Sequence, residues 1–148
     1  MITLSKMGHA ELVTRAERWL RNTFHCRVVF AEMKAYTAFG EIPDTIGWVN
    51  NRSILVECKS NRPDFLADSQ KRCRGEKSLG SWRFYLTGPG IVMPGELPGG
   101  WGLYEVHGNK VVHKDGLKYQ NAAQPPFESN KNSEIAMLLS AFRVGEEK

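Results

Sequence analysis

The sequence predicts an α/β fold in which a mixed central sheet is flanked by helices, with a hairpin and a helix at the C-terminal end. Apolar residues recur at helical spacing near both ends of the chain, and short β-rich runs fill the middle. One predicted helix lies between two of these strands, which is the connection that a parallel pair requires. With 148 residues, 41% of them hydrophobic and 24% charged, the chain has room for one core, so we expect residues 1–148 to form a single domain.

The first element is predicted to be a helix over residues 8–23. Its apolar residues follow helical spacing and arginines lie between them, so one side of the helix should be buried; the apolar positions are Leu12, Val13, Ala16, Trp19 and Leu20. Residues 26–32 are rich in β-branched and aromatic types and predict the first strand.

Residues 45–50 and 53–59 predict two strands joined by the turn residues Asn50, Asn51 and Arg52. Because a strand points alternate side chains to opposite faces, Glu57 and Lys59 should share one face. The other face should pack against the core through Ile54, Val56 and Cys58. The hairpin would also bring the Asp44 end of one strand next to the Glu57 end of the other.

The next helix is predicted over residues 63–73, since Pro63 suits the first helical turn. Residues 82–87 then return as a strand. Residues 88–100 are dense in proline and glycine and predict a loop. We interpret this loop as a plain connector, and the alternative is that it lines a groove for DNA.

The last part of the chain predicts a hairpin and a closing helix. Residues 101–106 and 110–113 flank a turn, and residues 115–130 form a polar connector. Residues 132–144 carry an apolar stripe at helical spacing, so this helix should dock through that stripe; its members are Ile135, Leu138, Leu139 and Phe142.

The strongest chemical signal is Pro43-Asp44 followed, after a twelve-residue gap, by Glu57-Cys58-Lys59. Two converging carboxylates make a hard, all-oxygen ligand set, which suits Mg²⁺ or Mn²⁺. An ammonium beside them can hold the attacking water and offset charge that develops on a phosphate. The alternative is structural: Asp44 closes a turn, and Glu57 and Lys59 form a solvated pair on a half-exposed strand.

These residues resemble the core motif of the PD-(D/E)XK nuclease superfamily, and the likeness is closest to its small stand-alone bacterial and phage members. The resemblance covers residues 8–90 and implies a restriction-endonuclease-like core. It further implies that Asp44 and Glu57 bind the metal, that the Cys58 carbonyl is a backbone ligand, and that Lys59 positions the water.

In that superfamily a helix before the motif usually contributes another acid. Glu11 and Glu17 are the candidates here, and we choose Glu11 because it lies in the opening turn of its helix. Its alternative role is to favour the helix macrodipole. Some members carry a Gln or Lys on the helix after the motif, and Gln70 and Lys71 remain open for that role.

The chain is mildly basic, with a net charge of +4, but its cations cluster near the motif. Such a cluster favours contacts with a phosphate backbone, so DNA is the expected partner. The alternative is a solubilising helix face. Oligomeric state stays open, and a homodimer is one option. The nucleic-acid-binding candidates are Arg62, Gln70, Lys71, Arg72 and Arg74.

The sequence shows no apolar stretch of membrane-spanning length and no signal peptide at its start, so we expect a cytoplasmic protein without a membrane partner. Cys26, Cys58 and Cys73 are too widely spaced for a zinc site or a disulfide framework and are expected to be buried or inert thiols.

Together, the motif and its resemblance predict a Mg²⁺- or Mn²⁺-dependent deoxyribonuclease, acting as an endonuclease in DNA repair, recombination or phage DNA processing. The rival hypothesis is a nucleic-acid-binding module that has the same fold and cuts nothing. All three core positions carry competent residue types, and this favours the enzyme.

Overall fold

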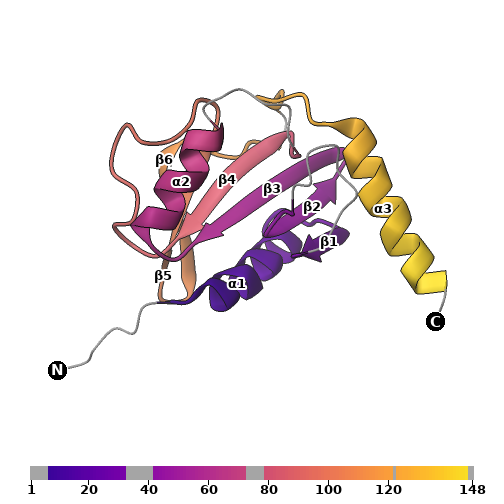
Figure 1. Cartoon of the computed structure of the whole chain (residues 1–148), viewed down its shortest axis with the longest axis horizontal. Coiled ribbons are helices and arrows are strands. Elements are labelled where there is room, and N and C mark those ends of the chain that lie inside the picture. The colour runs from indigo at the N-terminus through magenta and orange to yellow at the C-terminus, as the bar shows by residue number, and fades with distance from the viewer. Residues whose placement is uncertain (1–6, 33–41, 73–78, 122, 147–148) are drawn as a thin grey trace.

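The structure is a computed structural model that describes residues 7–32, 42–72, 79–121 and 123–146. In these residues six strands form one sheet in the order β1-β2-β3-β4-β5-β6. The pairs β3/β4 and β4/β5 are parallel, and the other neighbours are antiparallel. The predicted α/β class with a mixed sheet is therefore confirmed (Figure 1). The elements are α1 His9–Asn22, β1 Val28–Ala31, β2 Thr45–Val49, β3 Arg52–Lys59, α2 Arg62–Arg72, β4 Trp82–Thr87, β5 Gly102–His107, β6 Lys110–Gly116 and α3 Lys131–Glu146.

The central strand β3 is covered on both faces. Its residues Ile54, Val56 and Cys58 pack into one hydrophobic cluster with the buried stripe of α1. Leu55 packs into a second cluster with Phe65 of α2. The predicted alternation along β3 is thus confirmed, and helices on opposite faces of the sheet explain why six of its eight residues are buried.

The loop between β4 and β5 does more than connect them. A parallel pair usually needs a helical crossover, but the residues between these strands contain no helix or strand. Instead the loop packs on the α2 face of the sheet through Ile91, Val92 and Leu97. The prediction of a loop over residues 88–100 is confirmed, and its apolar side chains provide the cover that a second helix would otherwise give.

Several element boundaries differ from the prediction. The first strand begins at Val28 rather than residue 26, because the chain turns after α1 with His25 at a φ of 61° and the Cys26 N–H donating to the Leu20 carbonyl at 3.0 Å. At the other end of the chain, β6 continues to Gly116, so the connector is shorter than predicted. Residue 73, the predicted end of the second helix, lies outside the described residues.

The closing helix forms where it was predicted, but the prediction of its docking face is wrong. Three members of the apolar stripe are exposed: Ile135 by 53%, Leu139 by 63% and Phe142 by 66%. The buried residues of α3 are Ser133, Glu134 and Met137, in the N-terminal half of the helix. Figure 1 shows the rest of the helix projecting beyond the end of the sheet.

A buried carboxylate explains why α3 turns this side inward. Glu134 accepts hydrogen bonds from Trp48 Nε1 at 3.3 Å, Ser53 Oγ at 2.8 Å and the Gly80 backbone N–H at 2.9 Å. These donors come from three separate parts of the sheet and its connections. A buried carboxylate must keep its donors, so the helix is held through its first turn rather than through its apolar stripe.

Two further expectations concern the cysteines and membranes. Cys26 and Cys58 are buried free thiols, as predicted, while Cys73 lies outside the described residues. Among the helices of the described ranges, none combines the length and the apolar character needed to cross a membrane.

Candidate active site

The β2–β3 hairpin brings Asp44 and Glu57 together, as predicted. Thr45 pairs with Val56, which places the preceding Asp44 beside Glu57 at the same end of the hairpin. The turn residues Asn50 and Asn51 have φ values of 51° and 65°, the left-handed conformation that two-residue hairpin turns of type I′ require. Asn tolerates this conformation better than most residues, so the turn sequence fixes the register that joins the two acids.

Asp44 is also fixed by the strand that it faces. Its Oδ2 accepts a hydrogen bond from the Cys58 backbone N–H at 2.8 Å. This bond leaves the other carboxylate oxygen, Oδ1, turned toward His9, whose Nε2 lies 3.5 Å away. Asp44 is therefore held in one orientation between Glu57 and the start of α1.

Glu57 lies in an environment that favours its neutral form. Glu57 is buried, with 3% of its surface exposed. Burial raises the pKa of the Glu57 carboxyl well above its usual range, and the charge of Asp44 and a hydrogen bond with Asp44 raise it further, while Arg72 acts in the opposite direction. A cation bound beside the two carboxyls would offset the charge of Asp44 that contributes to this raised pKa.

Arg72 and Asp68 reach into the site from α2. Arg72 Nη2 lies 2.7 Å from Glu57 Oε1, and Arg72 Nε lies 3.4 Å from Asp68 Oδ2. Asp68 also accepts a hydrogen bond of 2.5 Å from the Tyr85 hydroxyl, and its Oδ1 is 3.8 Å from Lys59 Nζ. The lysine thus lies on the same face as Glu57, as predicted, next to Asp68, which the sequence analysis did not select.

A second group of ligand atoms gathers on the other side of Asp44. The ligand atoms of His9, Glu32 and Asp44 all lie within 4.8 Å of one another, and His9 Nε2 is 3.0 Å from Glu32 Oε1. His9 Nδ1 is 3.2 Å from the Cys58 carbonyl oxygen, the atom predicted as a backbone ligand. The oxygens of Cys58 and Glu32 can only accept, so the ring nitrogens of His9 are the donors in these two contacts. A metal-binding histidine keeps one N–H bonded to a carbonyl or carboxylate while its other nitrogen binds the ion, so a metal would take the place of the proton on Nε2.

Glu11, the acid chosen from the first helix, lies in the opening turn of α1 and is exposed. In the part of the chain that the structure describes, His9 and Glu32 gather around Asp44 instead. His9 is two positions before Glu11, so the first turn of α1 lies next to Asp44, and the catalytic role of Glu11 stays a prediction. Glu32 gave no signal, because it follows a short strand and no motif surrounds it.

The predicted nucleic-acid-binding residues lie in different environments. Gln70 and Lys71 are exposed on α2, and Arg74 lies outside the described residues. Asp44, Glu57 and Asp68 form a group that we call the acid cluster. Arg72 is held within this cluster, with its side chain 13% exposed. Their contacts with DNA stay a prediction.

Arg62 is held by the loop after β4. Its guanidinium makes a two-pronged ion pair with Glu96, with both N–O distances at 2.9 Å, and also donates to the Ile91 carbonyl. This pairing with Arg62, together with the Met93 N–H, lowers the pKa of Glu96 to about 2. Arg62 therefore fastens the loop to α2, and its contact with DNA also stays a prediction.

Comparisons with known proteins inform the fold. No protein-family model and no curated protein matches the chain. Among solved structures, it is similar to the SPO1766 protein of unknown function from Silicibacter pomeroyi, with 23% sequence identity and a TM-score of 0.57. The match covers 94% of this chain and 90% of that chain. At this identity the likeness shows a shared fold.

The charge state of Glu57 leads to a stability prediction. We expect Glu57→Gln to raise the melting temperature of the metal-free protein at pH 7, because a neutral amide avoids placing a buried charge beside Asp44. The folded pKa lies above the unfolded value of about 4.3, so the folded state binds the proton more tightly. Wild-type stability relative to the variant should therefore fall as pH rises from about 4.3 through the raised pKa.

Thermal denaturation in EDTA across this pH range measures the effect. Glu128→Gln, at an exposed position in the connector before α3, is the matched control and should follow wild type at every pH. If Glu57→Gln is less stable than wild type at neutral pH, the ion pair with Arg72 outweighs burial and repulsion from Asp44.

Proposed function

We propose that the chain is a Mg²⁺- or Mn²⁺-dependent nuclease that hydrolyses phosphodiester bonds of DNA, with a PD-(D/E)XK type of site. The observation that carries the proposal is the meeting of Asp44 and Glu57 at one end of a hairpin, with Lys59 on the same face as Glu57. The resemblance of these residues to the superfamily motif supports it. The similarity to the solved structure supports the fold and carries no information about activity.

The residues fit a divalent metal ion. Asp44 and Glu57 supply two oxygen ligands, and the nearby charge of Asp44 is one cause of the raised pKa of Glu57, so the two groups are close enough to act on one ion. The Cys58 carbonyl, whose oxygen lies 3.2 Å from His9 Nδ1, supplies a neutral oxygen next to Asp44 and His9. A bound divalent ion would supply a Lewis acid that polarises the phosphate and lowers the pKa of a bound water.

The chain's own residues would then divide the remaining tasks. Lys59 would donate to a phosphate oxygen and hold the attacking water, with Asp68 at 3.8 Å orienting its ammonium. Tyr85 and Arg72 hold Asp68 in place. Hydrolysis places the hydroxyl of water on phosphorus and breaks one phosphorus–oxygen bond, and the leaving oxygen takes a proton. The ammonium of Lys59 offsets the negative charge that grows in this step.

One observation favours the rival hypothesis of a binding module without activity. Arg72 already contacts Glu57 at 2.7 Å, so a cation compensates this carboxylate without a metal. For a metal to use Glu57, Arg72 must give up or share this contact. The enzyme stays the preferred proposal because Asp44, Glu57 and Lys59 keep the residue types that the reaction needs.

The test is cleavage of a panel of labelled DNAs: single-stranded, duplex, flap and four-way junction, each with Mg²⁺, Mn²⁺ or EDTA. We expect nicking of at least one substrate with a divalent ion and none in EDTA. Tight binding without nicking on every substrate would make the binding module the better proposal. If the protein neither binds nor nicks any of these DNAs, both the nuclease proposal and the binding-module hypothesis are overturned.

A further inference from the structure

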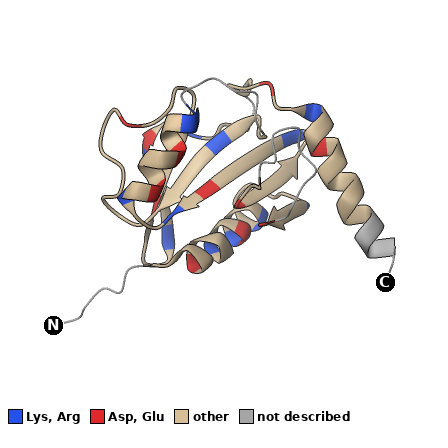
Figure 2. Ribbon diagram, viewed as in Figure 1, with Lys and Arg blue, Asp and Glu red and all other residues tan. Residues whose placement is uncertain are grey.

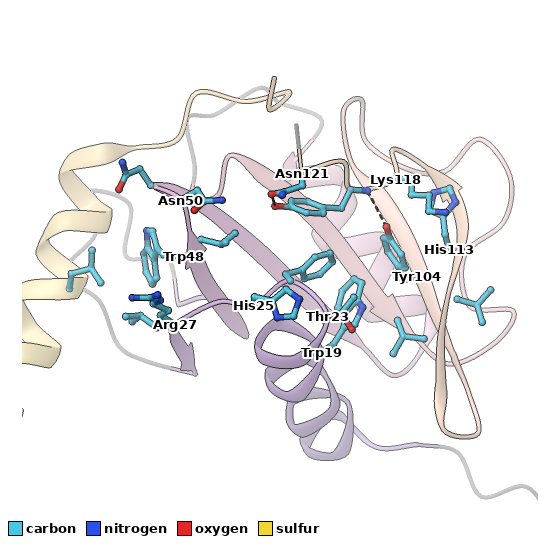
Figure 3. Close-up of a pocket in the computed structure, with 18 residues that line it drawn as sticks. Trp19, Thr23, His25, Arg27, Trp48, Asn50, Tyr104, His113, Lys118 and Asn121 are labelled. Atoms are coloured by element: carbon cyan, nitrogen blue, oxygen red, sulfur yellow. Dashed lines mark hydrogen bonds between the residues drawn. The ribbon is translucent and has the colours of Figure 1, made fainter. Parts of the chain in front are cut away.

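A large open groove lies at the end of α1 opposite His9. Its volume is about 1160 Å³. It is bordered by Thr23 and His25 just beyond α1, by the β2–β3 turn, by β6 and by the connector after it, and Leu138 of α3 lies at its edge. Figure 3 shows Trp48 and Arg27 at one end of the groove and Tyr104 and His113 at the other. The acid cluster contributes no residue to this groove.

Aromatic side chains form much of its wall. The rings of Trp19 and Tyr104 lie 4.6 Å apart, and those of Phe24 and Tyr119 lie 4.5 Å apart. Trp48 is fixed separately, because its Nε1 donates to Glu134. Trp19, Phe24 and Tyr104 are each 7% exposed and form the packed base of the wall. The half-buried rings of Trp48 and Tyr119 are the ones open to a ligand, and because they are already fixed, a planar ligand would stack on them with little loss of side-chain freedom.

The polar residues of the groove are cationic or neutral. None of its 18 described lining residues is an acid. Arg27 and Lys118 are exposed cations. Exposed amides add both donors and acceptors, of the kind that pair with the edges of bases; they are Asn50, Asn51 and Asn121. An anionic ligand with planar, hydrogen-bonding rings matches this combination.

The positive surface continues from the groove along α1. A smaller hollow of about 240 Å³ is lined by Arg15 and Arg18 and shares Trp19 and Thr23 with the groove. Figure 2 shows basic positions recurring along this helix, with acidic positions between them. A chain of phosphates leaving the groove would therefore meet further cations in the direction of the N-terminal end of α1.

We propose that this groove binds single-stranded nucleic acid. Bases would stack on the aromatic wall, and phosphates would contact Arg27, Lys118 and the arginines of the smaller hollow. Single strands expose the faces of their bases and a duplex does not, so single strands suit aromatic surfaces. An acidic peptide would satisfy the cations but would leave the rings and amides without partners. The site is separate from the acid cluster and does not depend on nuclease activity.

The test measures fluorescence anisotropy of a labelled oligo(dT) with the full chain in EDTA. Reversal of two charges, in Arg27→Glu with Lys118→Glu, should weaken binding at least about tenfold and lower the slope of log K against log salt by about 1.4, since each phosphate contact on a single strand contributes about 0.7. The matched control reverses Lys114 and Lys131, which are exposed and outside the groove, and should change affinity less than about twofold.

Three further ligands test the specificity of the groove: a duplex of equal length, dTMP and a poly-glutamate peptide. We expect oligo(dT) to bind more tightly than each of them. Equal affinity for the duplex or the peptide would overturn the proposal in favour of a general basic surface, and equal affinity for dTMP would replace it with a mononucleotide site. Equal losses in the groove variant and the control variant would also overturn it. Binding is measured in EDTA, where the proposed metal-dependent cleavage cannot occur, which separates this result from the nuclease test.

Discussion

Asp44→Ala is expected to abolish metal-dependent cleavage of DNA. Asp44 stands between Glu57 on one side and His9 on the other, so its loss removes the group that the two sets of ligand atoms share. Alanine also removes the acceptor for the Cys58 N–H. Asp44→Asn is therefore the sharper variant, because an amide oxygen keeps that hydrogen bond while the negative charge is lost.

We expect both variants to lose at least about three orders of magnitude in single-turnover rate, since removal of one preorganised stabiliser already costs about two to three orders. Calorimetry should show loss of Mn²⁺ binding, and thermal denaturation should show that Asp44→Asn is folded. Glu128→Gln, at an exposed acid remote from the hairpin end, should cleave like wild type. If Asp44→Asn cuts at the wild-type rate, Asp44 is not a ligand for the catalytic metal.

Lys59 should affect the chemical step much more than binding. Lys59→Ala is expected to lower the single-turnover rate by about two to three orders of magnitude, because an ammonium that offsets charge in the transition state contributes little to ground-state affinity. Lys59→Met keeps most of the apolar stem and removes only the charge, so it should lose nearly as much. Lys114→Met, at an exposed position on β6, is the control.

The measurement pairs single-turnover cleavage with equilibrium DNA binding for each variant. A loss of affinity as large as the loss of rate would show that Lys59 is a phosphate contact in the ground state. Unchanged cleavage in Lys59→Met would remove the lysine from the mechanism. In either case the role that the motif assigns to Lys59 would be wrong.

The parts of the fold that depend on neighbouring residues could be predicted from the sequence. The hairpin is an example: the Asn50-Asn51 pair specifies the turn, and alternation along β3 specifies which side chains share a face with Glu57. The register of the hairpin then follows, and with it the meeting of Asp44 and Glu57. A helix before β4 likewise predicted the parallel pair.

Features that depend on distant contacts could not be predicted in the same way. Glu32 reaches His9 across 23 positions in the sequence, and no periodicity links them. Asp68 and the inward position of Arg72, which was selected only as a candidate for binding DNA, could have been found, because both residues follow Phe65 at helical spacing and so share the inward side of α2. The apolar stripe of α3 led to a wrong prediction of its docking face. Periodicity shows that a helix has an apolar and a polar side, but it does not show that buried donors from Ser53 and Gly80 require Glu134 to face inward.

The order of the sheet has a consequence for how the chain folds. Every strand pairs with the one that precedes it in the sequence, so each pairing closes a short stretch of chain. Low sequence separation of this kind favours fast folding. The bonds of Glu134 have a much larger separation, since they reach back across 86 and 81 positions to Trp48 and Ser53. We therefore expect the sheet to assemble before α3 docks, and the contacts of α3 to slow unfolding rather than to speed folding.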